Sequence, residues 1–168
     1  SGAFSECVFT TNGQPTYPNP ISEAEWRRRL AIYHRLAAAL GPKLTVVAPD
    51  RVADQRVTLL RLARYRDEMA EIVDFGAEVL IPVQNGEIAP AEFFWAALQA
   101  SGLNLVPAMP MKKAATGYAE VLAFVQEVHP RRLHLLGMGY ERSQARRLVS
   151  MLQVIAPDME ITLDSNRL

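Results

Sequence analysis

The sequence predicts an α/β protein built from parallel strand–helix repeats, and three observations carry this prediction. Five short runs are apolar at nearly every position, as strands buried on both faces of a parallel sheet are. Longer amphipathic segments with helix caps separate the runs. The starts of successive runs lie 35, 24, 30 and 28 residues apart, close to the length of about 30 residues that one strand–helix unit takes. The predicted strands cover residues 44–48, 79–83, 103–106, 133–136 and 161–163.

Each segment between the strands carries a signal for the start or end of a helix. Ser22 and Glu25 have the spacing of a capping box. Asp54 and Thr116 are suited to cap two further helices, and Pro90 suits a first helical turn. Residues 10–21, with three prolines and Asn12-Gly13, are typical of a long loop, and residues 1–9 can hold a short strand. The predicted helices cover residues 22–40, 56–75, 90–101, 116–129 and 143–155.

Two architectures fit this pattern. The chain of 168 residues has the length of a single domain, which we take to span residues 1–168. Five or six strands are too few to close a (β/α)8 barrel, which takes about 250 residues. The pattern therefore predicts part of such a barrel, incomplete at both ends, or alternatively a doubly wound open sheet. Functional groups lie at the C-terminal ends of the strands in both cases.

Composition excludes several classes of protein. Hydrophobic residues make up 49% and charged residues 21% of the chain, so it is not a disordered chain. The 18 basic and 18 acidic residues cancel, so nucleic-acid binding would need a local basic patch. The lone Cys7 excludes an intrachain disulfide, and with only three histidines we expect no zinc site. There is no apolar run of about 18 residues and no basic start typical of a signal peptide, so we expect a soluble, cytoplasmic protein without a membrane partner.

Polar side chains follow several of the predicted strands. Asp50, Gln84 and Asp164 come directly after the first, second and fifth runs. Parallel strands bring such positions to one rim, and paired carboxylates with a positioned amide are what acid/base or glycosyl chemistry uses. Lys112 and Lys113 lie between a predicted strand and the next helix, where cations oppose the helix dipole. Their position predicts an anionic ligand at the rim.

Each of these residues also has a plainer interpretation. Asp50 could cap the helix that follows, although Asp54 is better placed for this. Gln84 could belong to a simple turn, and Asp164 lies so near the chain end that it could have no role. Gly137-Met138-Gly139 lacks the third glycine of a dinucleotide-binding fingerprint, so we expect no NAD.

Five short motifs occur in a fixed order along almost the whole chain. They are Ser1-Gly2-Ala3-Phe4-Ser5, Val46-Val47-Ala48-Pro49-Asp50, Ile81-Pro82-Val83-Gln84-Asn85-Gly86, Leu136-Gly137-Met138-Gly139, and the segment 158–164. In this order they resemble motifs of the tRNA-guanine transglycosylases. The resemblance is closest to their relatives that place 7-deazaguanine bases in DNA, the deoxypurine-in-DNA protein A family.

The resemblance implies a TIM-barrel fold and a base-exchange reaction. In that reaction an aspartate attacks C1′ of a nucleoside, guanine leaves, and a 7-deazapurine displaces the enzyme from the covalent intermediate. At the matching positions, Asp164 would be the nucleophile and Asp50 would accept hydrogen bonds from N1–H and the exocyclic amine of guanine. Gln84 would contact the O6 edge. The other implied residues are Ser1, Gly137 and Gly139, which would line the pocket, and Lys112, Lys113 and Arg167, which would contact phosphates.

The chain also departs from the family pattern. The acid/base aspartate of the first motif would precede Ser1, outside this chain, and Ala108-Met109-Pro110 stands where the family has a Gly-Gly loop. The zinc-binding cysteines of the family are absent. The resemblance therefore implies a core fragment or a truncated protein. We expect the chain by itself to bind a purine weakly and to exchange bases poorly or not at all.

The expected partners are a purine or 7-deazapurine base, DNA or tRNA, and a second copy of the chain in a homodimer. We expect no cofactor and no metal. Two alternatives stay open: a non-catalytic, purine-binding or nucleic-acid-binding remnant of the same fold, and an unrelated α/β enzyme that binds a phosphorylated ligand.

Overall fold

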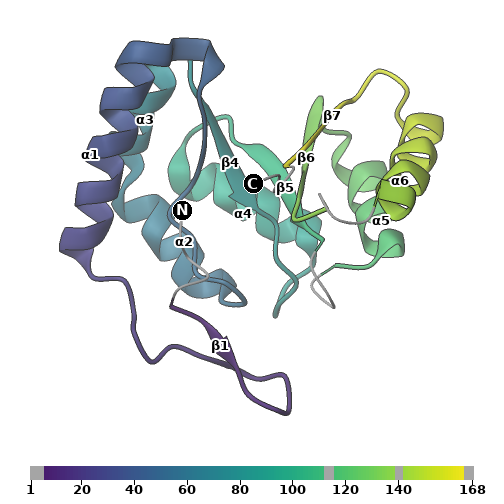
Figure 1. Cartoon of the computed structure of the whole chain (residues 1–168), viewed down its shortest axis with the longest axis horizontal. Helices are drawn as coiled ribbons and strands as arrows, with labels where there is room; N and C mark the ends of the chain where they lie inside the picture. The colour runs from purple at the N-terminus through teal and green to yellow at the C-terminus, as the bar shows by residue number, and fades with distance from the viewer. Residues whose placement is uncertain (1–5, 112–115, 139–141, 165–168) are drawn as a thin grey trace.

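A five-stranded parallel sheet forms the centre of the protein (Figure 1). The computed structural model describes residues 6–111, 116–138 and 142–164. Neighbouring strands follow one another in chain order, which confirms the predicted parallel pairing. A doubly wound sheet reverses its strand order at a switch point, and the described strands show no reversal. The strands are β3 (Thr45–Val47), β4 (Glu78–Pro82), β5 (Val106–Pro110), β6 (Arg132–Leu136) and β7 (Glu160–Leu163).

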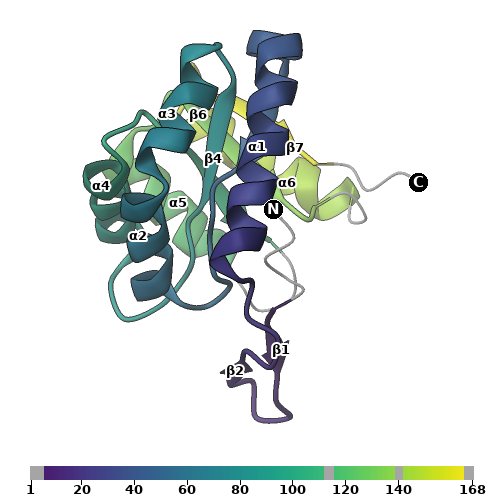
Figure 2. The same ribbon diagram turned by 90° about the vertical axis from the view of Figure 1, so that its left-hand side faces the viewer.

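Helices flank the sheet, and Figures 1 and 2 show that they cover one of its faces. The single helix predicted over residues 56–75 is wrong, because Tyr65 (φ −105°, ψ 23°) separates two shorter helices. The other helices agree with the prediction to within a few residues. They are α1 (Glu23–Leu40), followed by a 3-10 turn η2 (Gly41–Lys43), then α2 (Gln55–Arg64), α3 (Arg66–Asp74), α4 (Pro90–Ser101), α5 (Tyr118–Val128) and α6 (Arg142–Ile155).

The helix caps differ in part from the sequence prediction. Ser22 Oγ accepts a hydrogen bond from the Glu25 N–H at 3.2 Å, as a capping box requires. The Glu25 carboxylate binds Arg28 and Arg29 instead, because these cations lie one turn along the same helix. Thr116 does not cap α5; its N-cap is Gly117, whose N–H donates to the carboxylate of Glu120 at 2.6 Å.

We expect Ser22→Ala to lower the free energy of unfolding by about 1 kcal/mol, since it removes the side-chain cap bond of the first turn of α1. Thermal unfolding followed by circular dichroism measures the change. Ser150→Ala, at an exposed position within α6, serves as the control and should change stability by less than about 0.5 kcal/mol. Equal stability of the Ser22→Ala protein and the wild type would contradict the assigned cap.

The third strand lies further along the chain than predicted. The sequence suggested residues 103–106, whereas β5 begins at Val106 and includes Pro107 and Pro110. Prolines lack the N–H that the strand ladder uses, so the sequence pattern does not extend the predicted strand through Pro107 and Pro110. Pairing continues nevertheless, because Ala108 O accepts from the neighbouring strand segment at Val83 N (2.8 Å). Ala108, Met109 and Pro110 are thus part of the sheet.

The N-terminal segment contains a hairpin in place of the uniform loop predicted for residues 10–21. Strands β1 (Val8–Phe9) and β2 (Pro15–Thr16) pair antiparallel. Gly13 lies in the connecting turn with φ +76°, a conformation that favours glycine. Figure 2 shows this hairpin extending away from the helices.

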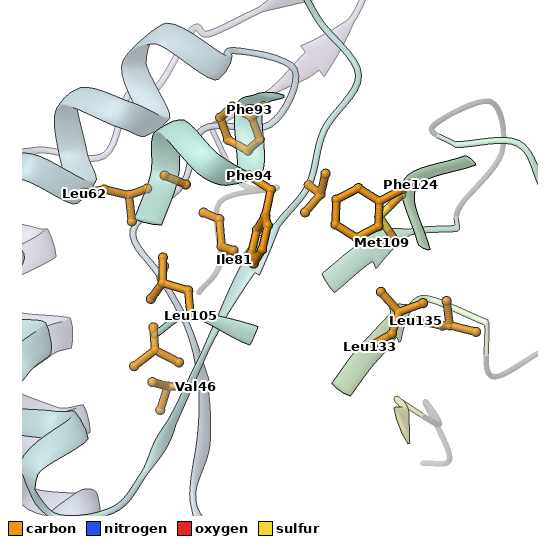
Figure 3. Packing of buried hydrophobic residues seen from close by; sticks show 14 of the residues in the cluster. Val46, Leu62, Ile81, Phe93, Phe94, Leu105, Met109, Phe124, Leu133 and Leu135 are labelled. Atoms are coloured by element: carbon orange, nitrogen blue, oxygen red, sulfur yellow. The ribbon is translucent and has the colours of Figure 1, made fainter. Parts of the chain in front are cut away.

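The two faces of the sheet carry different residues. On one face Ile81 and Met109 are fully buried in one cluster with Phe94 of α4 and Phe124 of α5 (Figure 3). The rings of these two phenylalanines meet edge to face, with centroids 5.7 Å apart. The apolar packing between this face and the helices is therefore the main core of the protein.

On the opposite face the sheet carries polar pairs. His134 Nδ1 lies 2.8 Å from Thr162 Oγ1. Arg132 bridges three strands by binding Glu78 and Glu160. This face is thus more polar than the helix-covered one. None of the described helices is both long and apolar enough to cross a membrane.

Candidate functional site

Asp50 and Gln84 meet at the C-terminal edge of two neighbouring strands. Asp50 follows β3 and Gln84 follows β4, and both side chains are buried, with 3% and 6% of their residue surface exposed. Gln84 Nε2 donates to Asp50 Oδ2 at 3.2 Å. Parallel strands deliver both residues to one edge, so the predicted proximity of these two residues is confirmed.

Bonds to both ends of the Gln84 amide determine its orientation. Its Oε1 accepts the main-chain N–H of Ala53, so the Nε2 side must face the Asp50 carboxylate. The main-chain oxygen of Gln84 accepts a hydrogen bond from Gln55 Nε2 at 2.8 Å. A Cβ at Gly86 would collide with this same Gln55 side chain. Segment 84–86 is therefore part of a packed polar site, and Gln55 is a site residue that sequence reasoning missed.

Asp54, and not Asp50, caps the helix that follows the first strand of the sheet. Asp54 Oδ1 accepts the Val57 N–H at 2.9 Å and is the N-cap of α2. The alternative in which Asp50 caps this helix is therefore wrong. Ala53 within the turn has φ +58°, an uncommon conformation for a residue with a side chain. Several hydrogen bonds, including the one to Gln84, hold this conformation.

A buried ion pair lies next to Asp50 and had no signal in the sequence. Glu6 is fully buried, and Arg61 of α2 binds its two carboxylate oxygens at 2.6 and 3.0 Å. Arg61 also donates to the main-chain oxygen of Asp50. Burial raises the pKa of the Glu6 carboxyl, but hydrogen bonds from Arg61 and the Ile21 N–H outweigh it, so the net pKa is lowered. Glu6 is consequently an anion at neutral pH.

Aromatic and cationic side chains complete this cluster. The Arg51 guanidinium lies 4.6 Å from the centre of the Tyr17 ring, and Arg51 Nε is 3.6 Å from Glu6 Oε1. The Tyr17 hydroxyl donates to Val52 O at 2.7 Å, and burial raises its pKa to about 12. Burial also raises the pKa of Cys7, which opposes a role as a nucleophile.

Asp164 and Gly137 form a second polar group at the C-terminal ends of β7 and β6, across the sheet from β3. The Gly137 N–H donates to Asp164 Oδ1 at 2.5 Å, so these two predicted site residues are in contact. His134 lies on β6, the strand that leads to Gly137, and is a site residue that sequence reasoning missed. Burial lowers the pKa of His134, and the nearby Asp164 carboxylate opposes this shift without cancelling it.

The two groups stand at opposite ends of the strand order. Asp50 follows β3 and Asp164 follows β7, with three strands between them. Four strand spacings of about 4.8 Å would separate them by roughly 19 Å in a flat sheet, and curvature of the sheet shortens this distance. A single pocket shared by Asp50, Gln84 and Asp164 stays a prediction.

Several predicted site residues lie outside the described part of the chain. They are Ser1, Lys112, Lys113, Gly139 and Arg167. Within residues 6–111, 116–138 and 142–164, no group of three or more His, Cys, Asp or Glu side chains is arranged to hold a metal ion. An open hollow of about 520 Å³ lies between α1 and α3, and its lining includes Arg27, His34 and Glu71 but none of the predicted site residues.

Comparison of the chain with models of known protein families, with curated protein sequences and with solved structures finds no match in any of the three.

Proposed function

We propose that this chain is the core of a base-exchange transglycosylase that replaces guanine with a 7-deazapurine in DNA or tRNA. One observation carries the proposal: a buried carboxylate, Asp50, is held against a buried amide, Gln84, at the C-terminal edge of a parallel sheet. The sequential strand order supports an arc of a (β/α)8 barrel, the fold that the sequence motifs imply.

The arrangement of Asp50 and Gln84 suits one edge of guanine. An ionised carboxylate accepts two hydrogen bonds side by side, and guanine offers N1–H and the 2-amino group in that geometry. Gln84 Oε1 is already occupied by the Ala53 N–H and one Nε2 hydrogen by Asp50 Oδ2, so the amide has one further donor on its Nε2 side. A donor is what the O6 acceptor of guanine requires. Adenine reverses this pattern of donors and acceptors and is excluded.

Asp164 takes the part of the nucleophile in this proposal. Its carboxylate forms a bond to C1′ of the nucleoside as the C1′–N9 bond breaks, and the electron pair of that bond leaves with the purine. The Gly137 N–H binds one carboxylate oxygen, which orients the other toward the substrate. N9 of an incoming 7-deazapurine then bonds to C1′ as the C1′–O bond to Asp164 breaks. The departing purine takes up a proton at N9 and the incoming base gives up its N9 proton, so the exchange balances.

A second candidate is a purine-binding protein without catalysis. The three strands between Asp50 and Asp164 favour this candidate, because the Asp50–Gln84 contact forms at the ends of β3 and β4 without Asp164. The phosphate-binding alternative depends on Lys112 and Lys113, which lie outside the described residues. Exchange of labelled guanine into DNA and tRNA, measured together with purine binding, separates the first two candidates. Binding without exchange in the natural protein that carries this chain would favour the second.

Asp50→Asn tests base recognition directly. We expect it to weaken guanosine binding by about 10-fold to 100-fold, because charge-assisted hydrogen bonds to the carboxylate are lost. Calorimetric titration with guanosine, inosine and adenosine measures the effect. Asp158→Asn, exposed in the turn before β7, is the matched control and should bind like the wild type. Equal binding of guanosine and adenosine by the wild type would remove Asp50 from base recognition.

A further inference from the structure

The Glu6–Arg61 ion pair links the N-terminal segment to α2 directly beside Asp50. Both terminal nitrogens of Arg61 bind the Glu6 carboxylate, at 2.6 and 3.0 Å, and the Ile21 N–H donates to Glu6 Oε2 at 2.7 Å. Removing two charges from water costs about as much free energy as their attraction returns, so such a pair is weak evidence for a role in stability. Its geometry points to a different role.

Arg61 joins the ion pair to the Asp50 main chain. Its Nη1 donates both to Glu6 Oε1 and to Asp50 O. A guanidinium holds its donors in one rigid plane. Glu6 therefore sets the orientation of that plane, and the plane sets the position of the Asp50 carbonyl.

The turn beyond Asp50 is held in the same manner by side chains from distant parts of the chain. The Tyr17 hydroxyl binds Val52 O at 2.7 Å, and Gln84 Oε1 accepts the Ala53 N–H. Ala53 adopts φ +58°, a conformation that persists where the surroundings impose it. The Asp50 carboxylate thus projects from a main chain whose position several side chains determine.

We propose that Arg61, oriented by Glu6, is a positioning residue for Asp50 and sets the selectivity of the site for purines that carry a 2-amino group. This inference rests on the proposed base-binding role of Asp50. A carboxylate in the plane of the base accepts from both N1–H and the 2-amino group, whereas a tilted one keeps only one good hydrogen bond. Guanosine and inosine share N1–H and O6 and differ only in the 2-amino group, so their affinity ratio reports the tilt.

Arg61→Lys is the test variant, because lysine keeps a positive charge beside Glu6 but lacks the planar fork. Calorimetry gives the dissociation constants of guanosine and inosine for each protein. We expect the wild type to prefer guanosine by about tenfold or more and Arg61→Lys to bring the ratio to within about threefold of one. Arg64→Lys, whose arginine pairs with Glu23 on the exposed side of the same helix, is the matched control and should keep the wild-type ratio.

A second readout needs no ligand. Amide hydrogen exchange at Ala53 should be faster in Arg61→Lys than in the wild type when the two proteins have equal global stability. If Arg61→Lys does not fold, the double variant Glu6→Leu/Arg61→Met removes both charges together and is measured in the same way.

The outcomes separate this inference from the proposed function. An unchanged guanosine-to-inosine ratio in the folded variant overturns the positioning role, even if both affinities fall equally, because equal losses indicate general loosening. An unchanged rate of amide hydrogen exchange at Ala53 would show that Arg61 does not fix the conformation of the turn. If the wild type binds neither nucleoside while exchange at Ala53 accelerates in the variant, the proposed function and the selectivity role fail together, and only the hold on the turn stands.

Discussion

Under the mechanism that we propose, Asp164→Asn is expected to abolish the covalent glycosyl–protein intermediate and to lower base exchange by at least about 10³-fold, because an amide oxygen is a poor nucleophile toward C1′. The substitution is nearly isosteric, and the amide oxygen can still accept the Gly137 N–H that Asp164 Oδ1 accepts now. The loss would therefore reflect chemistry and not folding. It is measured in the natural protein that carries this chain, by labelled guanine exchange and by mass spectrometry of the adduct.

Two controls accompany this measurement. Asp158→Asn lies at the other end of the same strand, in an exposed turn, and should exchange bases at the wild-type rate. Guanosine binding by Asp164→Asn should stay within about threefold of wild type, since Asp50 and Gln84 make the base contacts in our proposal. Full exchange by Asp164→Asn would remove Asp164 from the nucleophile role.

Arg61→Met is expected to lower the free energy of unfolding by about 3–5 kcal/mol at neutral pH, because it leaves the Glu6 carboxylate buried without its partner. Urea denaturation measures the change. Arg64→Met removes the exposed ion pair with Glu23 and should cost less than about 1 kcal/mol. Adding Glu6→Leu to Arg61→Met should recover part of the loss, since no unpaired charge then remains.

The loss should also depend on pH. In the wild type the pKa of Glu6 is lowered from 4.5, so its contribution to stability is complete above pH 4.5 and fades as the pH falls through the folded-state pKa. Without Arg61 only the Ile21 N–H and Arg51 still oppose the desolvation that raises the Glu6 pKa, so that pKa is higher than in the wild type and protonation in acid relieves the buried charge. The difference between wild type and Arg61→Met should therefore shrink below about pH 4.5. A difference that is independent of pH would show that lost packing, and not the charge of Glu6, causes the destabilisation.

Local signals in the sequence determined the order and type of most elements. Pro90 and Gly102 bracket α4 as predicted, with Gly102 in the left-handed conformation at φ +66°. The apolar runs found strands β3, β4, β6 and β7 to within one or two residues. Such features depend on residues within one or two helical turns of each other, so all the interacting groups lie within one short segment of the sequence.

The contact between Asp50 and Gln84 was also predictable, for a topological reason. Both residues directly follow apolar runs, and neighbouring parallel strands end at one edge of the sheet. Their 3.2 Å contact therefore required only the correct strand order. The position of β5 was not predictable in this way, because Pro107 and Pro110 resemble loop residues and only pairing with β4 and β6 makes them part of a strand.

Only the tertiary structure decided what surrounds the site. Glu6 and Arg61 are 55 residues apart in the chain, and His134 and Thr162 are 28 apart. No periodicity or cap marks such pairs, because each side chain taken alone fits many solvated positions equally well. Burial chooses among those positions: a carboxylate removed from water must find a partner, and which partner lies within reach depends on how the strands and helices pack together.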